Sequence, residues 1–421
     1  MTEPAKTEEK PSPYLHRALG TFGAAAFVVS SMVGTGIFTV PSVVRNATGS
    51  GLASLGVWLG GAFLALCGAF CISELATRMP RAGGEYQYLT QVYGRMWGFV
   101  SGWISFFAGF AAPTAASALG AVAYAKILFP AWNPNASVID GLDVTQGAAI
   151  AAATSLAMAV VHSLGVRPSG RLQTILAATA VSSIVLFALI GFATGRGNWS
   201  GVTQTSEATG LWWLALIQVS FAYTGWNAAA YLAGEVRAPR KTLPRALIGG
   251  TLVVVILYII LNLLFFYALP PNAWTSDIAV GQLAAEHLFG KDGAKIVSVI
   301  VTITILGSIS AWTASGPRVY FAMAREGAFF ARAAQLHPRW QTPVSAIIAQ
   351  GVCAIAMTFT SFPQLILYIG FSLTLFTSLA VASVFLFRRR ADWQKLSILQ
   401  RGYPLIPLLY VVTGAAMITY G

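Results

Sequence analysis

Residues 30–44 read SSMVGTGIFTVPSVV and place two glycines and a threonine in the middle of a long apolar run. Glycine inside a helix costs about 0.5–1 kcal/mol relative to alanine, and β-branched neighbours add to this cost, so residues 34–37 favour a local loss of helix. In a bilayer, each freed backbone N–H or C=O group costs several kcal/mol unless protein, water or a ligand satisfies it. We therefore expect this segment to face a cavity; the alternative is that the glycines only allow close helix packing.

The composition indicates an integral membrane protein, because 56% of the 421 residues are hydrophobic and only 10% are charged. Apolar runs of about 17–25 residues match the hydrocarbon core of about 30 Å, whereas β-barrel strands would show short alternating segments. We predict an all-α protein with eleven spans. Their predicted positions are 20–44, 52–77, 93–129, 146–163, 170–194, 209–234, 243–270, 277–312, 343–361, 364–387 and 403–420.

The formal net charge of +12 is distributed unevenly along the chain. If the N-terminus is cytoplasmic, most of the 26 lysines and arginines fall in the N-terminal tail or in cytoplasmic connections, as the positive-inside rule requires. We therefore predict a plasma (inner) membrane protein with its N-terminus in the cytoplasm and, after eleven spans, its C-terminus extracellular or periplasmic. The basic residues are expected to contact the lipid bilayer and not nucleic acid.

The sixth predicted span repeats the feature of the first, because FAYTGWNAAAYLAGEV at 221–236 again carries Gly, Thr and Asn near the middle of the bilayer. Two interrupted spans at matched positions are typical of transporters built from inverted repeats. The corresponding division of the chain has four parts. These are a disordered cytoplasmic tail at 1–17, five-helix repeats at 18–195 and 205–388, and a cytoplasmic loop with the eleventh helix at 389–421.

Two interrupted helices that meet would offer opposite poles to one ligand. A half-helix that starts at a break presents free N–H groups and suits a carboxylate, whereas one that ends there presents free carbonyls and suits an ammonium group. This geometry predicts an α-amino-acid site. The N–H groups expected at the carboxylate belong to Gly34, Thr35, Gly36 and Ile37, and the carbonyls expected at the amino group to Phe221, Ala222 and Thr224.

Four stretches resemble the amino acid-polyamine-organocation (APC) superfamily. They are GTGIF at 34–38, SELATRMPRAGGEYQYLTQVYG at 73–94, FAYTGWNAAAYLAGEVRAPRKTLPRAL at 221–247 and GPRVYFAMAREG at 316–327, the last resembling the loop after helix eight. The resemblance, which is to bacterial L-amino-acid transporter-like members, implies a leucine-transporter-type fold with a 5+5 inverted repeat, discontinuous helices 1 and 6, and one further helix. It also implies alternating-access transport, with Phe221 as the gate that closes over substrate.

The sequence departs from the family at two places. Several members carry a lysine on the fifth helix where this chain has Ala180, so a sodium ion held by hydroxyls such as Ser308 or Ser182 is one alternative, although such hydroxyls usually bond their own backbone. Members commonly have twelve helices, and this chain stops after the predicted eleventh. The loop after the third span carries no cysteine, so we expect no disulfide-linked subunit; the oligomeric state is left open.

Neutral L-amino acids are the expected substrates, carried by uniport, exchange or ion coupling. The acidic residues Glu74 and Glu235 fall near span ends, where each is either a cytoplasmic gate residue or an ion-pair partner of a nearby arginine. Aromatic faces can hold a cation without a carboxylate, so cationic amino acids or polyamines remain the alternative. Candidates for the substrate side-chain pocket are Phe107, Tyr223, Trp226 and Ser308.

Other classes of function fit the sequence less well. A channel or an amino-acid sensor would share the composition and would differ in flux. The four histidines, at positions 16, 162, 287 and 337, form no acid–base or metal-binding pattern, so we expect neither an enzyme nor a cofactor or resident metal.

Overall fold

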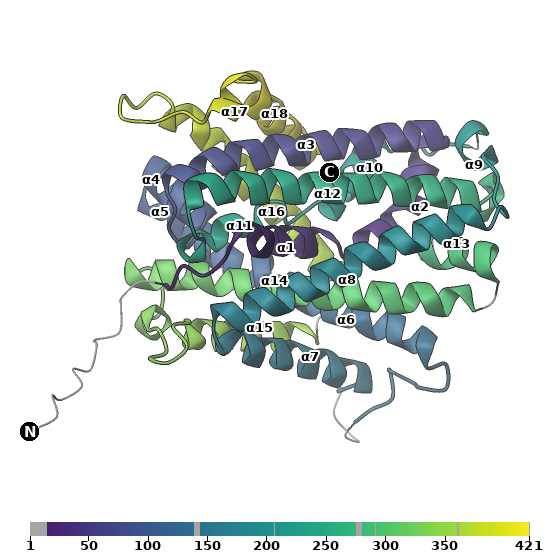
Figure 1. Ribbon diagram of the computed structural model, residues 1–421, viewed down its shortest axis with the longest axis horizontal. Coiled ribbons are helices and arrows are strands. Elements are labelled where there is room, and N and C mark those ends of the chain that lie inside the picture. The colour runs from purple at the N-terminus through teal and green to yellow at the C-terminus, as the bar shows by residue number, and fades with distance from the viewer. Residues whose placement is uncertain are drawn as a thin grey trace, which may run out of the picture.

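The computed structural model describes residues 15–138, 144–205, 207–274, 280–290, 292–359 and 362–420. Long helices run side by side along the long axis of the molecule (Figure 1), and the pairings between strand-like residues in these ranges are isolated bridges only. The prediction of an all-helical protein with several apolar helices is confirmed.

The first predicted span consists of two helices, α1 (Thr21–Met32) and α2 (Gly36–Thr48), which are bent by 46° relative to each other. Helix α1 ends because Val33 adopts an extended backbone with ψ of 98°. Helix α2 restarts at the second glycine, so the unwound part is Val33–Thr35. The glycines and β-branched residues predict a loss of helix over residues 34–37. The observed unwound segment is one residue shorter and begins one residue earlier.

The sixth predicted span is also broken, and its break is longer than that of the first span. Helix α10 (Trp212–Ala222) is followed by five residues of turn, 223–227, in which Gly225 has φ of +108°. The chain then forms only α11 (Ala228–Tyr231) and the 3₁₀ turn η2 (Ala233–Glu235) before the next long helix. A left-handed φ is the conformation that glycine adopts without steric strain.

Within the ranges that the structure describes, six unbroken segments are long and apolar enough to cross a membrane, and the bent α1–α2 pair makes up to seven. They are α3 (Gly51–Arg78), α5–η1–α6 (Arg95–Ile104, Ser105–Ala111, Ala112–Leu128), α7 (Gln146–Ser163), α8 (Val166–Ala193), α12 (Pro239–Ala268) and α14 (Gly293–Arg325). Four shorter apolar helices coincide with the remaining predicted spans. These are α10, α15 (Val344–Met357), α16 (Phe362–Phe387) and α18 (Leu405–Tyr420).

The eighth predicted span, 277–312, is wrong in its boundaries. The structure has a separate helix α13 (Val280–Phe289), a left-handed Gly290, and then α14, which continues to Arg325. The stretch 316–327 that resembles a loop is therefore helical up to Arg325. Proline disfavours a helix interior, but Pro317 lies inside α14 in a stretch where every residue from Gly307 to Ala324 is buried, so tertiary packing outweighs the local preference.

Short elements connect the long ones. They are α4 (Glu85–Tyr93), α9 (Ser200–Thr203), η3 (Pro271–Ala273), η4 (Ala331–Ala334) and α17 (Ser397–Gln400). Of the tail predicted at 1–17, residues 1–14 lie outside the described ranges, but Leu15 is buried against Ala82 and Phe321. The N–H groups of Ala18 and Leu19 both donate to the carbonyl of Glu235, which anchors this segment to the end of η2.

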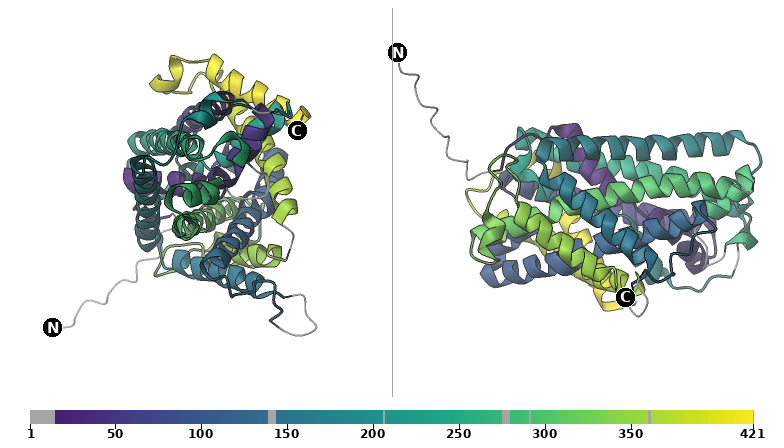
Figure 2. Two further views of the ribbon diagram at one scale, coloured as in Figure 1. Left: turned by 90° about the vertical axis from the view of Figure 1, so that its right-hand side faces the viewer. Right: turned by 90° about the horizontal axis from the view of Figure 1, so that it is seen from below.

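The broken helices lie in the middle of the bundle. Helix α1 packs against α8, α12 and α14, while α10 packs against α2 and α3. Helices α17 and α18 lie at one side of the molecule and α7 and α15 at the opposite side (Figures 1 and 2). A ligand held between the breaks would therefore lie inside the bundle of helices.

Two buried ion pairs lie near one end of the bundle, and neither involves the neighbour in sequence. Glu74 pairs with Arg388 and not with Arg78, and it also accepts a hydrogen bond of 2.9 Å from the Trp393 indole. Glu235 pairs with Arg318 at 2.9 Å. Because both acids are buried, a distant arginine that is itself buried becomes the partner, and the less buried neighbouring arginines do not.

Candidate functional site

The two breaks touch each other, and a glycine lies at both contacts. A Cβ atom added to Gly36, at the start of α2, would lie 3.0 Å from the Cα and Cβ atoms of Ala222, at the end of α10. A Cβ atom added to Gly225 would lie 2.6 Å from the Cβ of Ser31 in α1. The first and sixth spans therefore approach each other more closely than residues with side chains would allow.

Two buried hydroxyl groups donate hydrogen bonds to the carbonyls at the ends of α1 and α10. Ser308 of α14 donates to the carbonyls of Ser30 at 2.8 Å and Val33 at 2.9 Å. Tyr258 of α12 donates to the carbonyls of Met32 at 2.6 Å and Ala222 at 3.0 Å. Each hydroxyl has a single hydrogen. Two hydrogens are thus shared among four carbonyl groups, which leaves capacity to accept further hydrogen bonds.

The start of α2 supplies the opposite polarity. The first N–H groups of any helix have no partner within that helix, and here that first turn begins at Gly36. Thr35 precedes it with no side-chain cap, and the Thr39 hydroxyl instead donates to the Thr35 carbonyl at 3.2 Å. N–H groups and partly satisfied carbonyls therefore lie close together at the broken spans.

A cavity of about 60 Å³ lies directly at this junction. Among the expected site residues, it is lined by Gly34, Thr35, Gly36, Phe221, Ala222, Thr224 and Ser308. Ile37 is not part of the lining: it belongs to α2, and its side chain is fully buried in the core. Its backbone N–H still lies in the first turn of α2.

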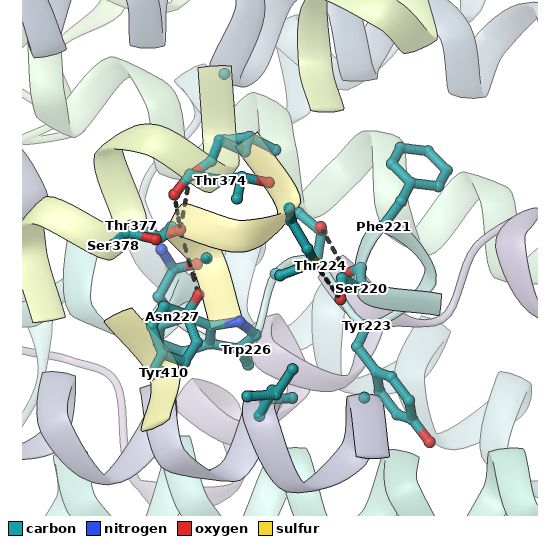
Figure 3. A pocket seen from close by; sticks show the side chains of 18 of the residues that line it. Ser220, Phe221, Tyr223, Thr224, Trp226, Asn227, Thr374, Thr377, Ser378 and Tyr410 are labelled. Atoms are coloured by element: carbon teal, nitrogen blue, oxygen red, sulfur yellow. Dashed lines mark hydrogen bonds between the residues drawn. The ribbon is translucent and has the colours of Figure 1, made fainter. Parts of the chain in front are cut away.

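A second cavity of about 70 Å³ lies on the other side of the second break. Phe221, Thr224, Trp312 and Leu373 line both cavities, so these four residues form the partition between them. Figure 3 shows the second cavity, with Phe221 and Tyr223 pointing to opposite sides of the chain. Movement of this partition would join the two spaces.

The aromatic residues expected at the site have different environments. Phe221 is partly buried and packs near Ala112, Ala115 and Ala116 of α6. Tyr223 and Trp226 both line the second cavity and are buried. Phe107, in contrast, lines neither cavity and is 46% exposed, stacking on Trp103 with ring centroids 6.1 Å apart. The structure therefore does not bring Phe107 to the others.

The expected pair of hydroxyls for sodium is not brought together either. Ser182 is exposed on α8, whereas Ser308 is buried and bonded to backbone carbonyls. Two residues after the buried Ala180, a helix has turned by about 200°, so Ser182 faces away from the core. Ala180 itself is on the buried face, and in the described part of the chain no cluster of three His, Cys, Asp or Glu residues could hold a metal ion.

Several lining residues were not predicted as site residues. Asn227 and Tyr231 line the second cavity, and the Asn227 amide donates to the Glu85 carboxylate at 2.6 Å. Glu85 lies in α4, outside the long helices; burial raises the pKa of its carboxyl to about 7, and hydrogen bonds from Asn227 and Tyr231 oppose that rise. Asn227 was visible in the sequence as an amide at the second break, but its partner Glu85 is 142 residues away.

The lining of both cavities is uncharged. The described residues around them have small, aliphatic, thioether, aromatic, hydroxyl-bearing or amide side chains, with no Asp, Glu, Lys or Arg. The only poles at the junction are therefore the backbone groups and hydroxyls described above.

These features define an integral membrane protein in which a central cavity lies between two broken helices, the arrangement of many secondary transporters. The amino acid permease family model matches residues 19–421, and the chain belongs to this family. The resemblance to APC amino acid transporters is thereby confirmed.

Named relatives extend this finding. The chain is 31% identical to the serine/threonine exchanger SteT of Bacillus subtilis, an alignment that covers 96% of this chain and 92% of the relative. It is 30% identical to the human large neutral amino acids transporter small subunit 2, covering 96% and 76%. It is 27% identical to the mouse Asc-type amino acid transporter 1, also covering 96% and 76%. All three relatives are named as transporters or exchangers, and none is named as an enzyme.

Proposed function

We propose that this protein exchanges neutral L-amino acids across the plasma (inner) membrane by alternating access, and that it holds the substrate between the two breaks. The proposal depends on one observation. The hydroxyls of Tyr258 and Ser308 have two hydrogens for four carbonyl groups, and these carbonyls lie beside the first turn of α2. One zwitterion would complete both sets of hydrogen bonds.

The substrate carboxylate is placed at the start of α2. The N–H groups of Gly34, Thr35, Gly36 and Ile37 are the proposed donors, because free N–H groups and the positive end of the helix dipole both favour an anion. Gly34, Thr35 and Gly36 line the cavity with no Cβ or only a small side chain toward it, so a carboxylate can approach their backbone.

The substrate amino group is placed at the end of α10. The carbonyl of Ala222 shares the single hydrogen of Tyr258 with Met32, so it retains acceptor capacity for an ammonium group. The Phe221 carbonyl already accepts from the Thr224 N–H at 3.0 Å, and it can accept a second hydrogen bond. Thr224 contributes its own carbonyl from the turn.

The substrate side chain is placed toward the partition, and Phe221 is the proposed gate. Phe221 borders both cavities, so rotation of its ring would close or open the connection between them. The uncharged lining favours a neutral side chain, because burying an unpaired charge here would be costly. Tyr223, Trp226 and Ser308 complete the proposed surroundings.

The proposed framework is the 5+5 inverted repeat with eleven spans. It is supported by the breaks, which fall in the first helix of each proposed repeat, 18–195 and 205–388. The proposed orientation has the N-terminus in the cytoplasm, supported by the exposed arginines and lysines at the connections on that side. The C-terminal α18 is proposed as the eleventh span.

A cationic substrate is the second candidate. Glu85 has no arginine or lysine partner among the ion pairs of the described residues, and it lies directly behind Asn227 in the wall of the second cavity. Reorientation of the Asn227 amide would bring that carboxylate to the cavity. This alternative predicts uptake of ornithine or putrescine that is lost in Glu85→Gln.

Counterflow in proteoliposomes tests the proposal. Purified protein is reconstituted in vesicles loaded with unlabelled serine, leucine, ornithine or putrescine, and entry of labelled serine or leucine is followed with and without H⁺ and Na⁺ gradients. Exchange predicts saturable entry that is accelerated by a neutral amino acid inside and is insensitive to the gradients. Binding without entry would indicate a sensor, entry that does not saturate a channel, and acceleration by ornithine or putrescine alone the second candidate; each of these results contradicts the proposal.

A further inference from the structure

A separate pocket of about 660 Å³ lies at the end of the bundle where the chain enters α1. Its walls are the segment 16–20, Gly23 of α1, the first turns of α8 and Arg237, two residues after η2. Four arginines border it, namely Arg17, Arg167, Arg171 and Arg237, together with His16. The central cavities share no residue with this pocket.

Backbone pairing creates one wall of this arginine pocket. Leu19 pairs with Val236 as an isolated parallel bridge, and the Arg237 N–H donates to the Leu19 carbonyl at 2.8 Å. Gly20 then lies beneath the Arg237 side chain, because a Cβ on Gly20 would lie 3.3 Å from its Nη2 atom. The position of this guanidinium is thus set by the fold.

Helix α8 provides the opposite wall. Arg167 and Arg171 are four residues apart and therefore lie on one face of the helix, where like charges repel each other. Arg17 donates to the Pro80 carbonyl at 3.4 Å. A carbonyl group is uncharged, so this hydrogen bond does not neutralise the positive charge of Arg17. Among the residues that the structure describes, none of the ion pairs involves any of the four arginines. The nearby Glu235 is already paired with Arg318.

The rest of the pocket is apolar or small. Val166 and Gly170 lie beside Arg167 and Arg171, and Gly23, Thr174 and Ile175 continue the lining along α1 and α8. Gly170 lies close to Leu19, since a Cβ on Gly170 would lie 2.8 Å from the Leu19 Cδ2 atom. Next to the pocket, Phe22 of α1 is 87% exposed, which is the exposure expected of a side chain in contact with lipid.

We propose that this pocket binds one anionic phospholipid. The phosphate would lie among the four arginines, since guanidinium groups bind phosphate through paired charge-assisted hydrogen bonds. One acyl chain would follow the apolar part between α1 and α8. A free phosphate would satisfy the arginines but leave that apolar part empty, and this is why the combination points to a lipid.

The position of the pocket suggests what the lipid would do. It bridges α8 and the first half of the broken first span, so an occupied pocket would hold α1 against α8. This consequence rests on the proposed function, in which α1 moves, whereas binding itself does not. The test below therefore measures binding, and its failure is distinguishable from failure of transport.

Native mass spectrometry of the full chain, purified with phosphatidylglycerol or phosphatidylcholine, measures lipid retention. The variant R167Q/R171Q removes two charges from the pocket, and R240Q/R245Q removes two exposed charges outside it. Each arginine near a membrane surface contributes about fivefold, so we expect about 30-fold weaker retention of phosphatidylglycerol in the first variant. Wild type and the second variant should retain it equally, and all three should retain little phosphatidylcholine.

Two further arms decide the remaining outcomes. Thr174→Trp fills the apolar part of the pocket without changing the charge of the pocket. This variant should retain less phosphatidylglycerol than wild type. Inorganic phosphate should displace the same fraction of the bound lipid from this variant as from wild type. If R167Q/R171Q does not fold, Thr174→Trp takes its place as the variant that tests the pocket. Equal loss in both arginine pairs, or full displacement by millimolar inorganic phosphate, would overturn the lipid assignment. So would a rise in retention after deletion of residues 2–12, which carry Glu3, Glu8 and Glu9, because the tail would then be the occupant.

Discussion

The two breaks differ in length and in support. The first is three residues long, Val33–Thr35, and regular helices of 12 and 13 residues lie on either side of it. The second is five residues long, and after it the chain forms a helix of only four residues and a short 3₁₀ turn. The first break is thus held between two regular helices, and the second continues into short helical turns.

Their hydrogen bonds differ in the same sense. The first break is served by side chains from two other helices, Ser308 of α14 and Tyr258 of α12. Among the described residues, the carbonyls beside the second break accept the shared Tyr258 hydroxyl and a local bond from the Thr224 hydroxyl to the Ser220 carbonyl at 3.2 Å, while Asn227 at its far end donates to Glu85 of the short helix α4. We infer that the first break acts as the fixed pole for the carboxylate. The second is the pole that changes shape when Phe221 closes.

Gly36→Val should have the largest effect, because it disrupts the fixed pole. The new Cβ lies 3.0 Å from Ala222, and the two Cγ atoms of valine add to this crowding; a resulting misplacement of about 1 Å costs about 100-fold in activity. We expect uptake to fall by that factor while the melting temperature changes little. Gly56→Val on α3 is the matched control, since no atom lies within 4 Å of its added Cβ. Normal affinity in Gly36→Val would exclude this site for the carboxylate.

Gly225→Ala should come next, because it acts on the more adaptable break. The φ of +108° is strained for alanine and the new Cβ meets Ser31 at 2.6 Å, but the turn can shift more easily than α2. We expect about a 30-fold loss of uptake. Gly60→Ala, which meets no atom within 4 Å, is the control. A loss larger than that of Gly36→Val would reverse the assignment of fixed and moving poles.

The sequence was sufficient to locate both breaks, because glycine and threonine inside apolar runs act through local backbone energetics. It did not give the start of α2, because contact with Ala222 contributes to where that helix begins. Phe107 was misplaced for a related reason: residues 105–111 form a π-helix, which shifts the register so that Phe110, and not Phe107, lines the cavity. Partners such as Arg388 for Glu74, 314 residues apart, depend on tertiary packing alone.

Phe221→Ala tests the gate and should have a moderate effect. Removing most of a partly buried ring from the partition loses apolar contact with a bound substrate, which corresponds to about tenfold weaker apparent affinity. Phe221→Leu should fall between wild type and alanine. Phe107→Ala serves as the control, since that ring is exposed and lines neither cavity. The measurement is the concentration dependence of uptake, and equal effects in the two alanine variants would argue against a gate at Phe221.

Tyr258→Phe should have the smallest effect and gives the sharpest test of the comparison. The substitution removes one hydrogen shared by Met32 of the first break and Ala222 of the second, for a net cost of about 1 kcal/mol, or roughly fivefold in binding. Tyr267→Phe on the same helix is the control. If the hydroxyl couples the two poles, its loss will combine non-additively with Gly225→Ala in a double-mutant cycle. Additive losses would mean that the two breaks respond to substrate independently, and the hydroxyl would then be only a local support of α1.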